Sequence, residues 1–182
     1  MASILDVPLL ACPNAKMITS PEDLFRWLDE RGLAYSTMRH AATFTVEEGR
    51  DLKASLPGGH TKNLFMTNKD GDLILISAHA DSDLLLNKLH RALGVKRLSF
   101  GKPDLMESVL GVRPGSVTAF ALVNDTQTRV RFIVDAALMD CDPLNFHPLV
   151  NTATTTISRA DFERFLEATG HGLSVVDFSS LE

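Results

Sequence analysis

The chain has 182 residues, of which 45% are hydrophobic and 23% charged, and a formal net charge of −5. This composition is typical of a soluble globular protein and excludes a disordered chain. The negative charge argues against a sequence-independent DNA coat or a polybasic membrane binder, and the short apolar runs exclude a membrane span of roughly 18 residues.

We expect one domain over 20–182, preceded by an N-terminal extension over 1–19 that has no clear periodicity. A chain of this length usually folds around one core, and no repeat or linker divides it. The two cysteines, Cys12 and Cys141, fit a reducing compartment better than a disulfide scaffold, and the N-terminus lacks the early positive charge of a signal peptide. The sequence therefore predicts a cytoplasmic protein.

The first half of the chain predicts helices and a hairpin. Ser20 and Pro21 are typical of a helix start, and Gly32 ends the helix. A strand over 34–40 and a short helix from Thr45 towards Leu52 and Leu56 follow. Strands over 63–68 and 73–79 flank Asp70-Gly71, a dipeptide that favours a tight turn, and the second strand is apolar on both faces and should be central.

The second half predicts alternating helices and strands. The expected helices lie over 81–93, 104–110 and 158–170, and the expected strands over 117–123, 129–134, 152–157 and 173–178. Hairpins mixed with helical connections favour an α+β (mixed α/β) domain. We expect a central, mixed but mostly antiparallel sheet of about six or seven strands flanked by helices.

Several common sites are absent from the sequence. The six histidines show no HExxH or comparable metal-ligand spacing, so no metal or other cofactor is expected. There is no GxSxG nucleophile motif. Cys141 lies between Asp140 and Asp142, which disfavour a thiolate, so both cysteines are interpreted as packing residues.

Three segments could carry chemistry. Lys62 follows a glycine-rich loop at the start of an apolar strand, where its ammonium could stabilise an anion or simply protrude into solvent. The glycines of 111–118 allow backbone N–H groups to approach a ligand, although a plain turn would also explain them. His147 precedes a proline and could be catalytic or a structural hydrogen-bonding residue.

A basic segment lies between Asp83 and Asp104. It holds no acid but contains His90 and five cations, Lys88, Arg91, Lys96, Arg97 and Lys102. Such a segment in an acidic protein could bind phosphates, or it could be a solvated helix face.

Taken together, the segments 62–65, 111–118 and 146–155 resemble the aminoacyl-tRNA deacylases of the YbaK/prolyl-tRNA-synthetase editing superfamily. Within it, the chain is most similar to the free-standing alanyl-tRNA(Pro) deacylases, the ProXp-ala or PrdX-like proteins, over about 21–170. The resemblance implies a YbaK-like fold and an enzyme that hydrolyses mischarged tRNA in trans. Such editing is needed because one missing methylene is worth only ~1–3 kcal/mol to a synthetase pocket.

The resemblance also implies site residues and partners. Lys62, Asn63 and His147 are expected to be catalytic. The expected substrate-binding residues are Gly115, Ser116 and Phe146, and the expected tRNA-binding residues are Arg97, Lys96 and Arg91. The partners would be the acceptor end of mischarged tRNA and, transiently, prolyl-tRNA synthetase, with no DNA, membrane or cofactor.

One position departs from the family pattern, and alternatives to this function stay open. The family's GxxxP motif maps onto 115–119, where Ala119 replaces the proline. The substrate expected is Ala-tRNA(Pro), hydrolysed by direct attack of water. The alternatives are a non-catalytic module that binds tRNA or an amino acid, and a deacylase for tRNA mischarged with cysteine or serine.

Overall fold

The computed structural model describes residues 17–42 and 54–180. Serine side chains cap the first turns of two of its helices. Helix α1 (Pro21–Asp29) begins where Ser20 Oγ accepts a hydrogen bond from Asp23 N at 3.1 Å. Helix α6 (Arg159–Thr169) begins at Ser158 in the same way and ends at Gly170, whose φ of 77° a glycine adopts without a Cβ penalty. Both predicted helices are confirmed, as is α4 (Pro103–Leu110).

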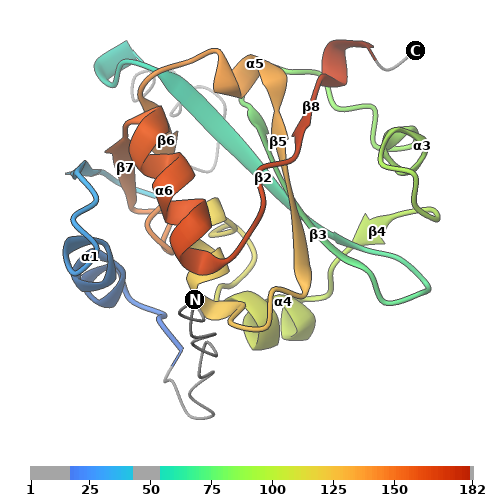
Figure 1. Ribbon diagram of the computed structural model, residues 1–182, viewed down its shortest axis with the longest axis horizontal. Helices are drawn as coiled ribbons and strands as arrows, with labels where there is room; N and C mark the ends of the chain where they lie inside the picture. The colour runs from blue at the N-terminus through green and yellow to red at the C-terminus, as the bar shows by residue number, and fades with distance from the viewer. Residues whose placement is uncertain (1–16, 43–53, 181–182) are drawn as a thin grey trace, which may run out of the picture.

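The strands form one mixed sheet (Figure 1). In spatial order its main path is β1 (Tyr35–Arg39), β7 (Ala153–Ile157), β6 (Leu144–Phe146), β2 (Gly59–Thr67), β3 (Leu73–His79), β5 (Val130–Asp135) and β8 (Val175–Val176), and β4 (Ser99–Phe100) pairs with β2 off this path. The pairs β6–β2, β3–β5 and β5–β8 are parallel and the other four are antiparallel. The α+β class is confirmed, with eight strands within the described residues.

The predicted hairpin lies at the centre of the sheet. Strands β2 and β3 pair from Thr61↔His79 to Thr67↔Leu73, and Asn68 Oδ1 accepts from two backbone N–H groups of the connecting turn. Six of the seven residues of β3 are buried, and the strand lies between β2 and β5. The expectation of a central strand is therefore confirmed.

Alternate residues of β2 face two different cores. Phe65 belongs to a large cluster that includes residues of α1, α4, α6 and the 3₁₀ helix η1 (Ala119–Asn124). Met66 belongs to a smaller cluster with α3 (Leu89–Ala92) and Phe178 of η2 (Phe178–Ser180). Because side chains alternate along a strand, odd-numbered residues of β2 share the face of the large cluster and even-numbered residues share the opposite face.

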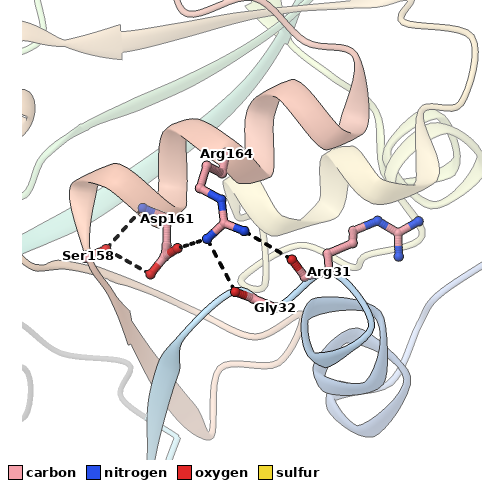
Figure 2. Close-up of polar contacts among 5 residues, drawn as sticks. All are labelled: Arg31, Gly32, Ser158, Asp161 and Arg164. Carbon is pink, nitrogen blue, oxygen red and sulfur yellow. Dashed lines mark hydrogen bonds and ion pairs between the residues drawn. The ribbon is translucent and has the colours of Figure 1, made fainter.

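A single arginine joins α6 to the loop that follows α1 (Figure 2). Arg164 Nη1 donates to Gly32 O at 3.3 Å and to Asp161 Oδ1 at 2.6 Å, and its Nη2 donates to Arg31 O at 3.3 Å. The planar guanidinium thus bonds two backbone carbonyls of the loop that follows the C-cap of α1. This contact fixes α1 and α6 on the large cluster.

Three predicted elements differ in the structure. Residues 117–123 are not a strand but lead into η1, where Thr118 caps the first turn and Ala119–Val123 are all buried; a continuous apolar run does not distinguish a buried strand from a buried helix. The helix expected over 81–93 shortens to α3. The last strand shortens to the two residues of β8.

Some predicted features lie outside the described residues. The helix from Thr45 towards Leu52 falls there, as does the N-terminal extension except for residues 17–19. One short helix, α5 (Ala136–Met139), was not predicted. Within the described part of the chain, no helix has both the length and the apolar character that crossing a bilayer requires.

Candidate active site

Lys62 lies on β2 with its side chain half-buried, and its ammonium is held by the backbone. Its Nζ donates to Ala80 O at 3.3 Å and to Ser82 O. Both carbonyls belong to the turn that follows β3, the strand antiparallel to β2. The ammonium is therefore fixed in direction rather than extended into bulk solvent.

Asn63 projects from the opposite face of the sheet to Lys62, because the two residues are adjacent on one strand. Its Oδ1 accepts from Ser77 Oγ, and its Nδ2 donates to Thr61 Oγ1 at 3.3 Å. Thr61 Oγ1 in turn donates to Asn145 O at 2.8 Å. Asn63 thus links β3 to β6, and a catalytic role for it would act through this network and stays a prediction.

His147 follows β6 directly, and its Nδ1 lies 3.1 Å from Ala153 O. A carbonyl oxygen can only accept, so Nδ1 carries the proton of the neutral ring and Nε2 is left as an acceptor. Burial lowers the pKa of His147, opposed by the Ala153 hydrogen bond and assisted by the nearby His40 ring. His147 is therefore neutral at pH 7.

The sequence analysis did not identify His40, which the structure places beside His147 at a ring-centroid distance of 6.5 Å. His40 Nε2 lies 3.0 Å from Thr154 Oγ1 on the adjacent strand β7. The strand pairing Arg39↔Ala153 brings these segments together. No local spacing in the sequence indicates a contact across more than 100 residues.

Phe146 is buried in the core, with 1% of its surface exposed. Its ring stacks on Phe162 at 4.7 Å and meets Phe120 edge-on at 5.4 Å. The side chain of Phe146, which was expected to bind the substrate, therefore belongs to the large cluster. Its role in binding the substrate stays a prediction.

The glycine loop after α4 is open around Gly115, where an added Cβ would meet no atom within 4 Å. Ser116 N already donates to Arg113 O at 3.0 Å, so this N–H closes a turn. Among the described residues, no hydrogen bond joins the loop to Lys62 or His147. A role for Gly115 and Ser116 in binding the substrate stays a prediction.

The basic segment borders a surface hollow beyond the far end of β2. This hollow has a volume of about 550 Å³ and is lined by Asn68, Lys69, Lys96, Arg97, Leu98 and Ser99. Lys96 Nζ pairs with Asp70 Oδ1 at 2.8 Å, and Arg91 is exposed on α3. The structure thus brings Lys96 and Arg97 together with Lys69, which the sequence analysis did not single out.

No group of three or more His, Cys, Asp or Glu side chains is placed to hold a metal ion among residues 17–42 and 54–180. The described polar groups around Lys62 and His147 include the ammonium itself, imidazole rings and hydroxyls, and the buried carboxylate of Asp135 lies behind Ser82. The ammonium and imidazole groups can bind and orient an ester and its oxyanion.

Comparison with known proteins identifies the family. The model of the aminoacyl-tRNA editing domain matches residues 40–165, which begin directly after β1, end within α6 and include Lys62 and His147. The chain belongs to the aminoacyl-tRNA editing domain family. The YbaK-type resemblance read from the three sequence segments is thereby confirmed.

Named relatives agree with this family. The chain is 34% identical over 165 residues to the Danio rerio prolyl-tRNA synthetase associated domain-containing protein 1, covering 87% of this chain and 90% of that protein. It is 28% identical over 151 residues to the prolyl-tRNA editing protein ProX of Acetoanaerobium sticklandii, covering 82% and 92%. A crystal structure of a candidate trans-editing enzyme for prolyl-tRNA synthetase has the same fold, with a TM-score of 0.65 at 20% identity over 88% of this chain and 97% of that one.

Ala119, where the resemblance leads us to expect a proline, is the first residue of η1. Thr118 Oγ1 accepts from Phe120 N at 3.3 Å and caps this turn. Proline is favoured at the first position of a helix, but a capped alanine fits there as well. The substitution therefore leaves the helix start intact in this chain.

Proposed function

We propose that this chain is a trans-editing deacylase that hydrolyses the ester of mischarged tRNA, with Ala-tRNA(Pro) as its substrate. Family membership supports the general activity, and the names of the relatives in the zebrafish and in Acetoanaerobium sticklandii support the link to prolyl-tRNA. The observation that carries the proposal is the fixed ammonium of Lys62. The enzyme would act in the cytoplasm, in transient association with prolyl-tRNA synthetase.

Lys62 has one donor to spare for the substrate. An ammonium carries three N–H donors, and the carbonyls of Ala80 and Ser82 occupy two of them. The third can donate to the terminal phosphate or to the ester oxygen. As water attacks the ester carbon, negative charge builds on that oxygen, and a prepositioned cation stabilises it more than it stabilises the neutral ester.

His147 supplies an acceptor rather than a second cation. Its neutral ring leaves Nε2 free to accept a proton from the attacking water or to orient a substrate hydroxyl. Lys62 would therefore act as a cation that stabilises negative charge, and His147 as a neutral base. This division suits direct attack of water without an acyl-enzyme intermediate.

We propose that the hollow beside Arg97 receives the acceptor arm. Thr67 lies five residue steps along β2 from Lys62, which is about 17 Å along an extended strand. This is on the order of five stacked nucleotides at about 3.4 Å each. An ester bound at Lys62 would then place the following nucleotides near Lys96 and Arg97, whose charges suit the phosphate backbone.

A panel of charged tRNAs tests this function. We would incubate the purified chain with tRNA(Pro) carrying labelled alanine, cysteine, serine or proline and measure the free amino acid. The proposal predicts rapid release of alanine and retention of proline. Preferential release of cysteine or serine would overturn the alanine specificity, and binding of every tRNA without hydrolysis would identify a non-catalytic module.

A further inference from the structure

One buried carboxylate near Lys62 has no place in the chemistry described above. Asp135 is the last residue of β5 and is 1% exposed. Its Oδ1 accepts from Ala137 N at 3.2 Å and caps α5. Its Oδ2 accepts from His79 N at 3.1 Å and from Ser82 Oγ.

Capping α5 explains only one of these three contacts. Serine, threonine or asparagine caps a helix nearly as well as aspartate, and none of them carries the desolvation cost of a buried charge. The second oxygen of Asp135 instead accepts hydrogen bonds from a different segment, the turn from His79 to Ser82. A charged acceptor makes the stronger hydrogen bonds that would hold such a turn.

The sheet topology explains why this turn is within reach. Strands β3 and β5 are parallel, with Ser77 opposite Val134, so both end at the same edge of the sheet. The turn is also tied to β2, because Ala80 N donates to His60 O at 2.7 Å. Ser82 N donates back to His79 O at 3.0 Å and closes the turn.

This turn is the one that holds the ammonium of Lys62. The acceptors of Nζ are the carbonyls of Ala80 and Ser82, so Ser82 receives Lys62 on its backbone and donates to Asp135 through its side chain. A lysine side chain is long and gains considerable rotamer freedom when released. Movement of Ser82 would therefore move the ammonium away from its position.

We propose that Asp135 is a positioning residue for Lys62, acting through Ser82. This inference rests on the proposed deacylase function, in which the third N–H of Lys62 meets the ester or its phosphate. Asp135 fixes the two carbonyls, the carbonyls fix the ammonium, and the ammonium is then aligned before the substrate binds. Asp135 itself makes no hydrogen bond to the substrate in this proposal.

Single-turnover hydrolysis of Ala-tRNA(Pro) by variants of the full chain tests this inference. Ser82→Ala removes the hydroxyl that bonds Asp135 and leaves the backbone carbonyls in the chain. A misplacement of about 1 Å can cost on the order of 100-fold, so we expect the rate at saturating enzyme to fall about 10- to 100-fold with little change in the enzyme concentration at half-saturation. Ser82→Thr retains a hydroxyl and should restore the rate.

Two comparisons separate positioning from general damage to the fold. Adding Ser82→Ala to Lys62→Met should cost nothing further, because the turn then has no ammonium to place. Ser179→Ala is a matched control: Ser179 Oγ donates to the exposed Asp177 Oδ1 at 2.6 Å, so the same kind of contact is lost where it has no link to Lys62. We expect that variant to keep the wild-type rate.

The outcomes distinguish this inference from the proposed function. Suppose that the wild type is active. The positioning role alone would be overturned if Ser82→Ala left the rate unchanged, or if its loss were additive with that of Lys62→Met. Failure of Ser82→Thr to restore the rate would also overturn it. A wild type that releases no amino acid from any charged tRNA would overturn both.

Discussion

Removal of His171 should destabilise the fold through the loss of one buried hydrogen bond to Asp125. His171 Nε2 lies 3.2 Å from Asp125 Oδ2, and the two side chains are 2% and 3% exposed. Asp125 Oδ2 also accepts from Val130 N at 2.6 Å, so the pair joins the loop after α6 to the start of β5. His171→Ala would leave a buried carboxylate with only backbone donors.

The cost follows from the burial of the pair. Losing a buried hydrogen bond to a charged group costs about 1.5–3 kcal/mol, and the Val130 N–H still bonds the carboxylate. At about 2–4 °C per kcal/mol for a chain of this size, a loss of about 2 kcal/mol lowers Tm by about 4–8 °C. Urea unfolding at pH 7 and a thermal melt measure the two quantities.

A double-mutant cycle isolates the charge interaction from lost packing. Asp125→Asn removes the charge, so His171→Ala should cost clearly less in that background than in the wild type. Packing losses are common to both backgrounds and cancel. An equal cost in both backgrounds, or a cost below about 1 kcal/mol in the wild type, would refute the reasoning.

Three further predictions concern pH and tRNA binding. Burial raises the pKa of Asp125, but hydrogen bonds from His171 and from the Val130 and Arg129 backbone outweigh it and leave the pKa below its ordinary value. The unfolded chain then binds more protons, so the free energy of unfolding should fall as the pH drops below about 4, and Asp125→Asn should flatten that fall in acid titrations. Because the pKa of His147 is lowered, deacylation should stay constant with pH down to below about 6.5, and His147→Gln should reduce it about 100-fold at neutral pH; an unchanged rate would remove His147 from the mechanism. Arg97→Ala should weaken tRNA binding and make its dependence on log salt shallower by about one, whereas an unchanged slope would exclude a phosphate contact.

Local signals in the sequence predicted much of the fold. The start of α1 at Ser20 and Pro21 and the ranges of α4 and α6 depend on neighbouring residues, and all were predicted. The hairpin followed from Asp70-Gly71 between apolar strands. The error at η1 has a physical cause, because burial on every side removes the periodicity that separates a helix from a strand.

The helix expected over 81–93 failed because of long-range contacts. Ser82 resembles a helix cap in the sequence, but its hydroxyl bonds Asp135 and its carbonyl bonds Lys62. These partners lie 53 and 20 residues away and are brought together by the sheet. Tertiary contacts therefore hold residues 82–85 outside any helix.

The candidate site was predictable in part. Lys62 and His147 stood out by their local context and by the family resemblance, whereas the His40 contact and the Asp135 network depend on pairing between distant strands. The placement of Asn63 opposite Lys62 follows from strand alternation, which the residues alone already implied. The burial of Phe146 was not predictable from strand alternation, because its ring stacks on Phe162 only once α6 is packed on the sheet.

The most direct test of the central claim is the single-turnover rate of Ala-tRNA(Pro) hydrolysis by Lys62→Met. Methionine keeps much of the apolar stem but removes the ammonium that Ala80 and Ser82 hold. Loss of one prepositioned donor should lower the rate about 100- to 1,000-fold, while Arg129→Ala, which removes an exposed charge on the approach to β5, should keep it. A Lys62→Met rate within about threefold of the wild type would contradict the account.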